Sequence, residues 1–136
     1  ICKANELRLD QKNIVCVSKC QNDIYVWYDK LQIEEVFTNF YTNAINHSTG
    51  KIKISLKKTD GKAKLEVYNS GNKIPENDLT RIWEKFYKVD KARTREYGGN
   101  GLGLSIVKAI LDNYDVEYGV DNVDDGVVFW CMFDCD

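Results

Sequence analysis

The stretch REYGGNGLGLSIVKAILDNY, residues 95–114, decides the fold, because a run of glycines leads directly into a helical pattern. Each glycine costs up to about 1 kcal/mol of conformational entropy where the chain is ordered. Apolar residues then recur three and four positions apart, which predicts a helix. A helix start offers unpaired N–H groups and the positive end of the helix dipole. The stretch therefore predicts either a phosphate-binding backbone or a flexible hinge. The glycines are Gly98, Gly99, Gly101 and Gly103, and the helical stripe is Ile106, Val107, Ile110, Leu111 and Tyr114.

Two common glycine loops are excluded by their surroundings. A dinucleotide-binding loop follows a strand, whereas the polar, basic segment KARTREY (91–97) precedes these glycines. A Walker loop ends in Gly-Lys-Ser/Thr, and no such triplet follows. The remaining interpretation is an unusual phosphate loop joined to a basic segment.

The composition is that of an ordinary soluble domain. The 136 residues are 43% hydrophobic and 29% charged, with a net charge of −2. This charge gives no basic footprint for nucleic acid, and no apolar run approaches the roughly 18 residues needed to span a membrane. We expect a single domain over 1–136, which starts abruptly at Ile1 as an excised domain would. The five cysteines lack zinc-site spacing and are expected to be reduced thiols.

The other predicted elements alternate between strands and helices. The predicted helix at 30–48 is expected to end with Gly50 as its C-cap. A weakly patterned segment at 72–98 is long for a loop and predicts a functional lid. The whole predicts an α+β fold, a two-layer α/β sandwich with a mixed, largely antiparallel sheet packed on helices. In chain order the expected elements are strands at 12–17 and 23–29, a helix at 30–48 with Leu31 on its apolar stripe, strands at 51–58 and 61–69, and two strands within 116–133.

Asparagines on the predicted helix form a second unusual feature. Asn39 and Asn43 lie four residues apart, so they share a face, and Glu35 extends that row by one turn. The row is either a solvated stripe or a source of amide oxygens that complete a Mg²⁺ shell. The segment NSGN at 69–72 is by itself a turn, or a place where a ligand approaches the backbone of Gly71 closely.

Together these segments resemble the ATP-binding catalytic domain of sensor histidine kinases, in the GHKL (Bergerat) ATPase superfamily. NFYTNAINHS (39–48) is similar to the N box and NSGNKIP (69–75) to the first glycine box. IWEKFYKVD (82–90) is similar to the F box and GGNGLGLSIVKAI (98–110) to the second glycine box. The resemblance implies the Bergerat fold, with ATP bound beneath a mobile lid.

The resemblance also implies a role for each site residue. Asn39 and Asn43 are the catalytic candidates, and Asn43 would bind the Mg²⁺ that bridges the phosphates. Asn39 stands where hydrolysing relatives carry a glutamate base, which favours transfer over hydrolysis. The remaining implied ATP contacts are Asn46, His47, Asn69, Gly71, Ile74, Tyr87, Lys88, Arg93, Gly99, Gly101, Leu102, Gly103 and Leu104.

Three residues depart from the family pattern. Asn69 replaces the aspartate that reads the adenine amino group, and a neutral hydrogen bond is roughly half as strong as a charge-assisted one. Lys73 replaces the second glycine of its box, and Asn46 replaces a basic residue. We therefore expect weak nucleotide binding.

The implied function is transfer of the γ-phosphate of Mg·ATP to a histidine elsewhere. His47 is the only histidine in the chain, and its INHSTG context lacks the acceptor pattern, so a cap or pocket-wall role is expected for it. The expected partners are ATP, a dimerisation and histidine-acceptor domain absent from this chain, and a response regulator. The expected location is cytoplasmic, in a membrane-bound sensor. The alternatives are a degenerate nucleotide-binding or docking module and an anti-sigma-type serine kinase, a group that generally lacks the F box.

Overall fold

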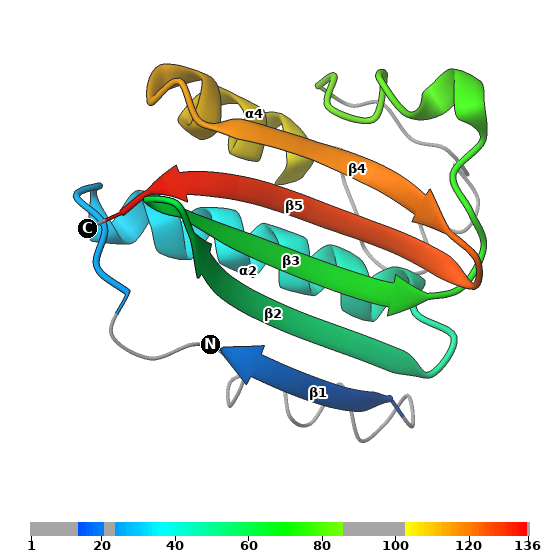
Figure 1. Ribbon diagram of the computed structural model, residues 1–136. Helices are drawn as coiled ribbons and strands as arrows, with labels where there is room; N and C mark the ends of the chain where they lie inside the picture. Colours follow the sequence, from blue (N-terminus) through cyan, green and yellow to red (C-terminus); the bar gives the residue numbers. More distant parts are fainter. Residues whose placement is uncertain (1–13, 21–23, 86–102, 136) are drawn as a thin grey trace.

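Within the residues that the computed structural model describes, a five-stranded sheet carries two α-helices on one face (Figure 1). The model describes residues 14–20, 24–85 and 103–135. This arrangement confirms the predicted α/β sandwich with a mixed sheet. The elements are β1 (Val15–Cys20), α2 (Lys30–His47), β2 (Lys51–Thr59), β3 (Lys62–Ser70), the short 3₁₀ helix η2 (Glu76–Asp78), α4 (Gly103–Asn113), β4 (Glu117–Val123) and β5 (Gly126–Asp134).

The strands follow the order β1-β2-β3-β5-β4, so the last hairpin is completed at the sheet edge. All neighbouring pairs are antiparallel except β1 and β2, which run parallel. Asp60 and Gly61 join β2 to β3 with φ angles of 50° and 77°. Both residues adopt the left-handed conformation, which an Asp-Gly pair accommodates and which fits the twist of a tight hairpin. The predicted hairpin is therefore confirmed.

The core lies between the sheet and the helices. Ile52 and Ile54 are buried and Leu56 is half-buried on the inner face of β2, as the alternation predicts. Phe40 of α2 packs on Phe129 of β5, with ring centroids 5.5 Å apart. This packing fixes α2 against the centre of the sheet. The buried residues of α2 are Val36, Phe40, Tyr41, Ala44 and Ile45.

The predicted strand at 23–29 is wrong, because residues 24–29 belong to no strand. The side chains still alternate: Val26 and Tyr28 pack against the core, while Tyr25 and Trp27 are 64% and 84% exposed. Tyr28 lies 5.0 Å from Tyr114, measured between ring centroids. The segment is thus anchored by side chains that alternate between the core and solvent, although its backbone joins no strand.

Smaller corrections concern the ends and faces of elements. The first strand lies at Val15–Cys20, later than the predicted 12–17. Ser48 caps α2 with extended backbone angles, so Gly50 is not the C-cap. Leu31 is 75% exposed, because Ile33 takes the inward position in this first turn, and Ile106 of α4 is 38% exposed.

Candidate functional site

Three of the predicted segments lie together in the structure. They are the second half of α2 itself, the turn after β3 and the first turn of α4. A Cβ built on Gly103 would lie 2.8 Å from Asn39 Oδ1, and one built on Gly71 would lie 2.7 Å from the carbonyl oxygen of His47. Both distances are shorter than real Cβ contacts, so a side chain at Gly71 would displace backbone, whereas one at Gly103 would displace the Asn39 amide. Gly71 and Gly103, which are 32 positions apart in the chain, thus contact the same helix, α2.

The amide of Asn39 is oriented by its own helix. Its Nδ2 donates to the backbone oxygen of Glu35 at 2.8 Å, with Glu35 Oε1 at 3.4 Å. The oxygen Oδ1 consequently faces Gly103 at the start of α4. Asn39, Asn43 and Asn46 are all half-buried, so the row is neither fully solvated nor part of the core.

The turn after β3 is fastened to the end of α2. Asn69 is the buried polar residue of this strand, 2% exposed, and its Nδ2 donates to the backbone oxygen of Ser70 at 3.1 Å. The backbone N–H of Thr49 donates to the same Ser70 oxygen at 2.9 Å, and that of Lys51 donates to Ser70 Oγ at 3.0 Å. The residues directly after the predicted N box are therefore joined to the first glycine box by one backbone hydrogen bond and one bond to a side chain. His47, the last residue of α2, is exposed.

The β4–β5 hairpin packs against the other side of this turn. Gly71, at φ +142°, donates its backbone N–H to the oxygen of Asp125 at 3.0 Å. A Cβ on Gly126 would lie only 2.0 Å from the backbone oxygen of Asn69. The first glycine box is thus enclosed between the end of α2 and the tip of this hairpin.

Asn122 of β4 is a site residue that the sequence analysis missed. The backbone N–H of Ile74 donates to Asn122 Oδ1 at 2.9 Å, and Asn122 Nδ2 donates to the oxygen of Ile74 at 2.8 Å. Ile74 itself is half-buried against the core. The one signal in the sequence is an asparagine inside a strand, where this residue type is depleted.

The segment after Pro75 is anchored in the core by the first part of the predicted F box. Ile82 and Trp83 are 5% and 8% exposed. Trp83 packs edge-on against Tyr118 of β4 at 4.9 Å and against Phe129 of β5 at 5.7 Å, measured between ring centroids. This part of the predicted lid is therefore held to the sheet.

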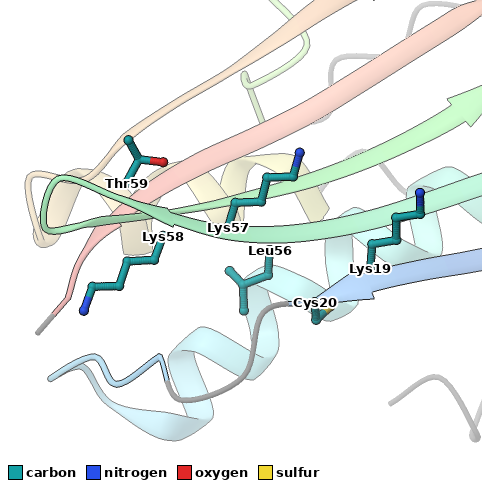
Figure 2. Close-up of a pocket in the computed structure, with 6 residues that line it drawn as sticks. All are labelled: Lys19, Cys20, Leu56, Lys57, Lys58 and Thr59. Atoms are coloured by element: carbon teal, nitrogen blue, oxygen red, sulfur yellow. The ribbon is translucent and has the colours of Figure 1, made fainter.

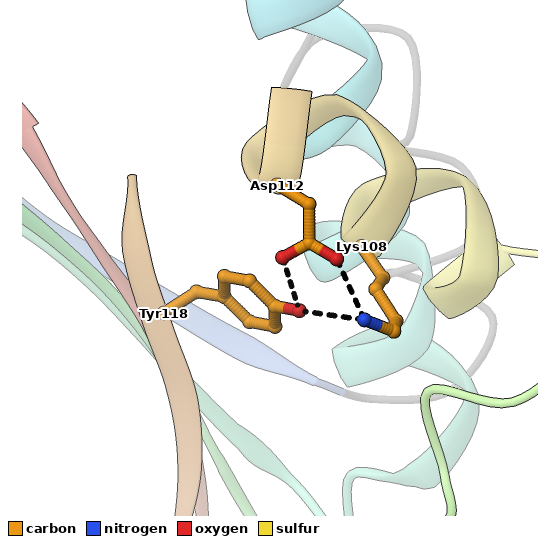
Figure 3. Close-up of polar contacts among 3 residues, drawn as sticks. All are labelled: Lys108, Asp112 and Tyr118. Atoms are coloured by element: carbon orange, nitrogen blue, oxygen red, sulfur yellow. Dashed lines mark hydrogen bonds and ion pairs between the residues drawn. The ribbon is translucent and has the colours of Figure 1, made fainter. Parts of the chain in front are cut away.

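A polar cluster beside Trp83 joins α4 to β4 (Figure 3). Lys108 Nζ lies 2.6 Å from Asp112 Oδ2, and the Tyr118 hydroxyl donates to Asp112 Oδ1 at 2.9 Å. The hydrogen bond from Lys108 lowers the pKa of Asp112, and the same bond raises the pKa of Lys108. Burial is the main reason why the pKa of Tyr118 is raised. The cluster orients α4, whose first turn faces Asn39.

Two surface hollows do not coincide with the predicted site. One of about 520 Å³ lies at the far end of β1 and β2, between Lys19, Cys20 and the residues 56–59 (Figure 2). Asn69 lies at the other end of the sheet, because it pairs with Ile52 at the start of β2. The other, of about 380 Å³, is lined by Leu79, Thr80, Trp83, Lys108 and residues 118–120.

The remaining predictions concern metal ligands, membrane spans, cysteines and the other site residues. Within 14–20, 24–85 and 103–135, no group of three or more His, Cys, Asp or Glu could hold a metal ion. Neither described helix has the length and apolar character needed to span a membrane. The four described cysteines are free thiols, and Leu104 is half-buried against the core. Tyr87, Lys88, Arg93, Gly99, Gly101 and Leu102 lie outside the described residues, as does the second part of the predicted lid, residues 86–98.

Comparison with known proteins identifies relatives of this arrangement. Residues 28–136 match the family model of the histidine kinase-, DNA gyrase B-, and HSP90-like ATPases. The chain is 35% identical over 104 residues to the sensor protein VanSB of Enterococcus faecalis, covering 75% of this chain and 23% of VanSB. It is 37% identical over 100 residues to the sensor histidine kinase YkoH of Bacillus subtilis, covering 74% of this chain and 22% of YkoH. The chain thus spans about a quarter of the length of these relatives.

Solved structures agree with the sequence relatives. The nucleotide-free catalytic domain of the histidine kinase ThkA superposes with a TM-score of 0.86 at 30% identity, over 97% of this chain and 86% of that domain. ThkA has also been solved in complex with the response regulator TrrA, where the likeness has a TM-score of 0.81 at 27% identity and covers 98% of this chain and 38% of that one. The fold is that of a histidine kinase catalytic domain, and the chain belongs to the family of histidine kinase-, DNA gyrase B-, and HSP90-like ATPases.

Proposed function

We propose that this chain is the catalytic domain of a sensor histidine kinase. In this proposal it binds Mg·ATP and donates the γ-phosphate to a histidine on a separate dimerisation domain in two-component signalling. The single observation that carries it is the orientation of the Asn39 amide, whose hydrogen bond to Glu35 turns its oxygen toward Gly103 at the start of α4. The proposal takes residues 1–136 as one domain with a lid at about 72–98, on the cytoplasmic side of a membrane-bound sensor.

The described residues fit a magnesium ion held mainly by phosphate oxygens. Asn43 is half-buried one turn after Asn39, and an amide oxygen is a hard ligand of the kind Mg²⁺ accepts. The described residues offer no carboxylate cluster that could hold the ion alone. We therefore propose Asn43 as the protein ligand. The ion would supply charge neutralisation at the phosphates.

The nucleotide base is proposed to lie against the turn after β3. Asn69 would offer an amide oxygen to an adenine amino group, while Gly71 would shape the turn that the base contacts, its missing side chain making room for the oxygen of His47. The half-burial of Ile74 supports a place in the wall of the base pocket. The weak affinity expected from Asn69 and Lys73 is part of the proposal.

The phosphates are proposed to lie beside the first turn of α4. Helix N–H groups stabilise negative charge there, and Gly103 gives room for Asn39. Leu104 would hold this turn against the core, with Asn46 and His47 at the rim of the site. The residues outside the described ranges keep their predicted roles, namely Tyr87, Lys88 and Arg93 in the lid and Gly99, Gly101 and Leu102 around the phosphates.

In the proposed reaction, a bond forms between an imidazole nitrogen and the γ-phosphorus, and the bond from that phosphorus to the bridging oxygen breaks. The attacking nitrogen uses its lone pair, ADP leaves with the electrons of the broken bond, and the other imidazole nitrogen releases its proton to solvent. His47 ends a helix and lies beside the first glycine box, so it is not proposed as the acceptor. A response regulator is proposed as the next partner, supported by the ThkA complex.

The test combines this chain with a separately produced acceptor domain and radiolabelled ATP. We expect an acid-labile, base-stable phosphohistidine on the acceptor, and much less of it with Asn43→Ala. Asn113→Ala, at the exposed end of α4, is the matched control and should behave as the unaltered chain. No binding at millimolar Mg·ATP would favour a docking module, and acid-stable phosphoserine would favour a serine kinase.

A further inference from the structure

The tip of the β4–β5 hairpin contacts the first glycine box at three successive points. The oxygen of Asp125 accepts from the N–H of Gly71, and Gly126 packs against the oxygen of Asn69. The third contact is made by a side chain, that of Asn122, with the backbone of Ile74. The hairpin lies at the edge of the sheet, and its strand β5 pairs with β3. It can therefore act as a rigid support for this loop.

The Asn122 contact satisfies both backbone groups of Ile74. Residues 72–75 belong to no helix or strand, so no ladder partner is provided there. In the described part of the chain, the Asn122 amide makes the only hydrogen bonds of the Ile74 backbone, at 2.9 and 2.8 Å. The two bonds run in opposite directions and engage the peptide groups on both sides of Ile74, so together they fix the orientation of its backbone as well as its distance from β4.

We propose that Asn122 is a positioning residue for the nucleotide base. It holds Ile74 at the place where that side chain meets the base, although the two residues are 48 positions apart in the chain. This inference rests on the proposed function, because it requires the base to bind against the first glycine box. The backbone contacts at Gly71 and Gly126 keep the loop attached without Asn122, so losing the side chain loosens Ile74 but leaves the fold intact.

The test measures Mg·ATP and Mg·GTP binding by calorimetry for the unaltered chain, Asn122→Ala and Asn122→Leu. We expect both variants to bind ATP about tenfold more weakly, equivalent to about 1.4 kcal/mol, which is the scale of one to two lost hydrogen bonds. Because only the base contact is affected, the preference for ATP over GTP should shrink. Likewise the KM for ATP should rise in phosphotransfer while kcat stays unchanged. Asn113→Ala is the matched control and should change none of these values.

The outcomes separate this inference from the proposed function. If the unaltered chain binds no nucleotide, both fail. If it binds ATP and Asn122→Ala binds equally well, or Asn122→Leu restores affinity by filling space, only the inference fails. Should Asn122→Ala lose its fold, Asn122→Asp decides, since it keeps the size and the acceptor for the Ile74 N–H but removes the donor. Unchanged ATP affinity in Asn122→Asp would overturn the proposal.

Discussion

Substituting Gly103 by alanine tests whether the orientation of Asn39 determines nucleotide binding. The new Cβ would lie 2.8 Å from Asn39 Oδ1, whereas ordinary van der Waals contacts are 3.4 Å or longer. The amide must therefore move by about 0.6 Å. The Asn39 side chain is held by its 2.8 Å hydrogen bond to the oxygen of Glu35. We therefore expect the amide to rotate out of its present position.

Two opposing contributions leave the stability nearly unchanged. Breaking the bond to Glu35 costs about 1 kcal/mol. Alanine in place of glycine regains up to about 1 kcal/mol in a helix, less at the first position of α4. The free energy of unfolding should thus stay within about 1 kcal/mol of the unaltered chain, while a displacement of this size in a binding group weakens Mg·ATP binding by about tenfold.

A double-mutant cycle measures this coupling. Mg·ATP affinity is determined by calorimetry for Gly103→Ala, Asn39→Ala and the double variant, and urea unfolding is followed for each. We expect Gly103→Ala to have no further effect once Asn39 has lost its amide, giving a coupling energy of about 1.4 kcal/mol. Unchanged affinity in Gly103→Ala, or the same loss in both backgrounds, would refute the reasoning.

Three further changes have expected outcomes. Gly126→Ala would place a Cβ 2.0 Å from the backbone oxygen of Asn69, where no flexible side chain can yield, and should lower the free energy of unfolding by about 2 kcal/mol or more in urea. Burial raises the pKa of Cys131 from 9.0 to about 12, so the folded protein binds more protons than the unfolded chain between these values. Stability should fall as pH rises above about 9, by at most about 1.4 kcal/mol per pH unit, and Cys131→Ala should remove this contribution whereas Cys20→Ala keeps it. Asn43→Ala should reduce the Mg²⁺-dependent part of ATP affinity, measured with and without a chelator, and an unchanged dependence would reject Asn43 as the ligand.

Local patterns in the sequence carry most of the fold. The alternation in 51–58 and 61–69 and the Asp60–Gly61 pair predict a hairpin, because strand faces and turn conformations depend on neighbouring residues. The segment 24–29, which joins no strand, shows the limit of this reasoning. Its side chains alternate as in a strand, yet a strand also needs a neighbour with free backbone groups, and alternation carries no information about one.

The candidate site depends more on contacts between distant residues. The row of Asn39 and Asn43 follows from helical spacing and could be predicted. The clasp between Asn122 and Ile74 could not, since it requires the register of β4 against β5 and the path of the loop after β3. No periodicity in the sequence encodes such a pairing.

The structure changes the interpretation of the glycine run at its last member. Gly103 is helical, and the described glycines with positive φ are Gly50, Gly61 and Gly71. Conformational freedom therefore does not explain a glycine at 103, which weakens the hinge interpretation at this position. What requires it is space, because any Cβ would displace the oxygen of Asn39. The glycine thus makes room for the Asn39 amide in the first asparagine-bearing turn of α2, and the same missing side chain would leave room for the proposed phosphate.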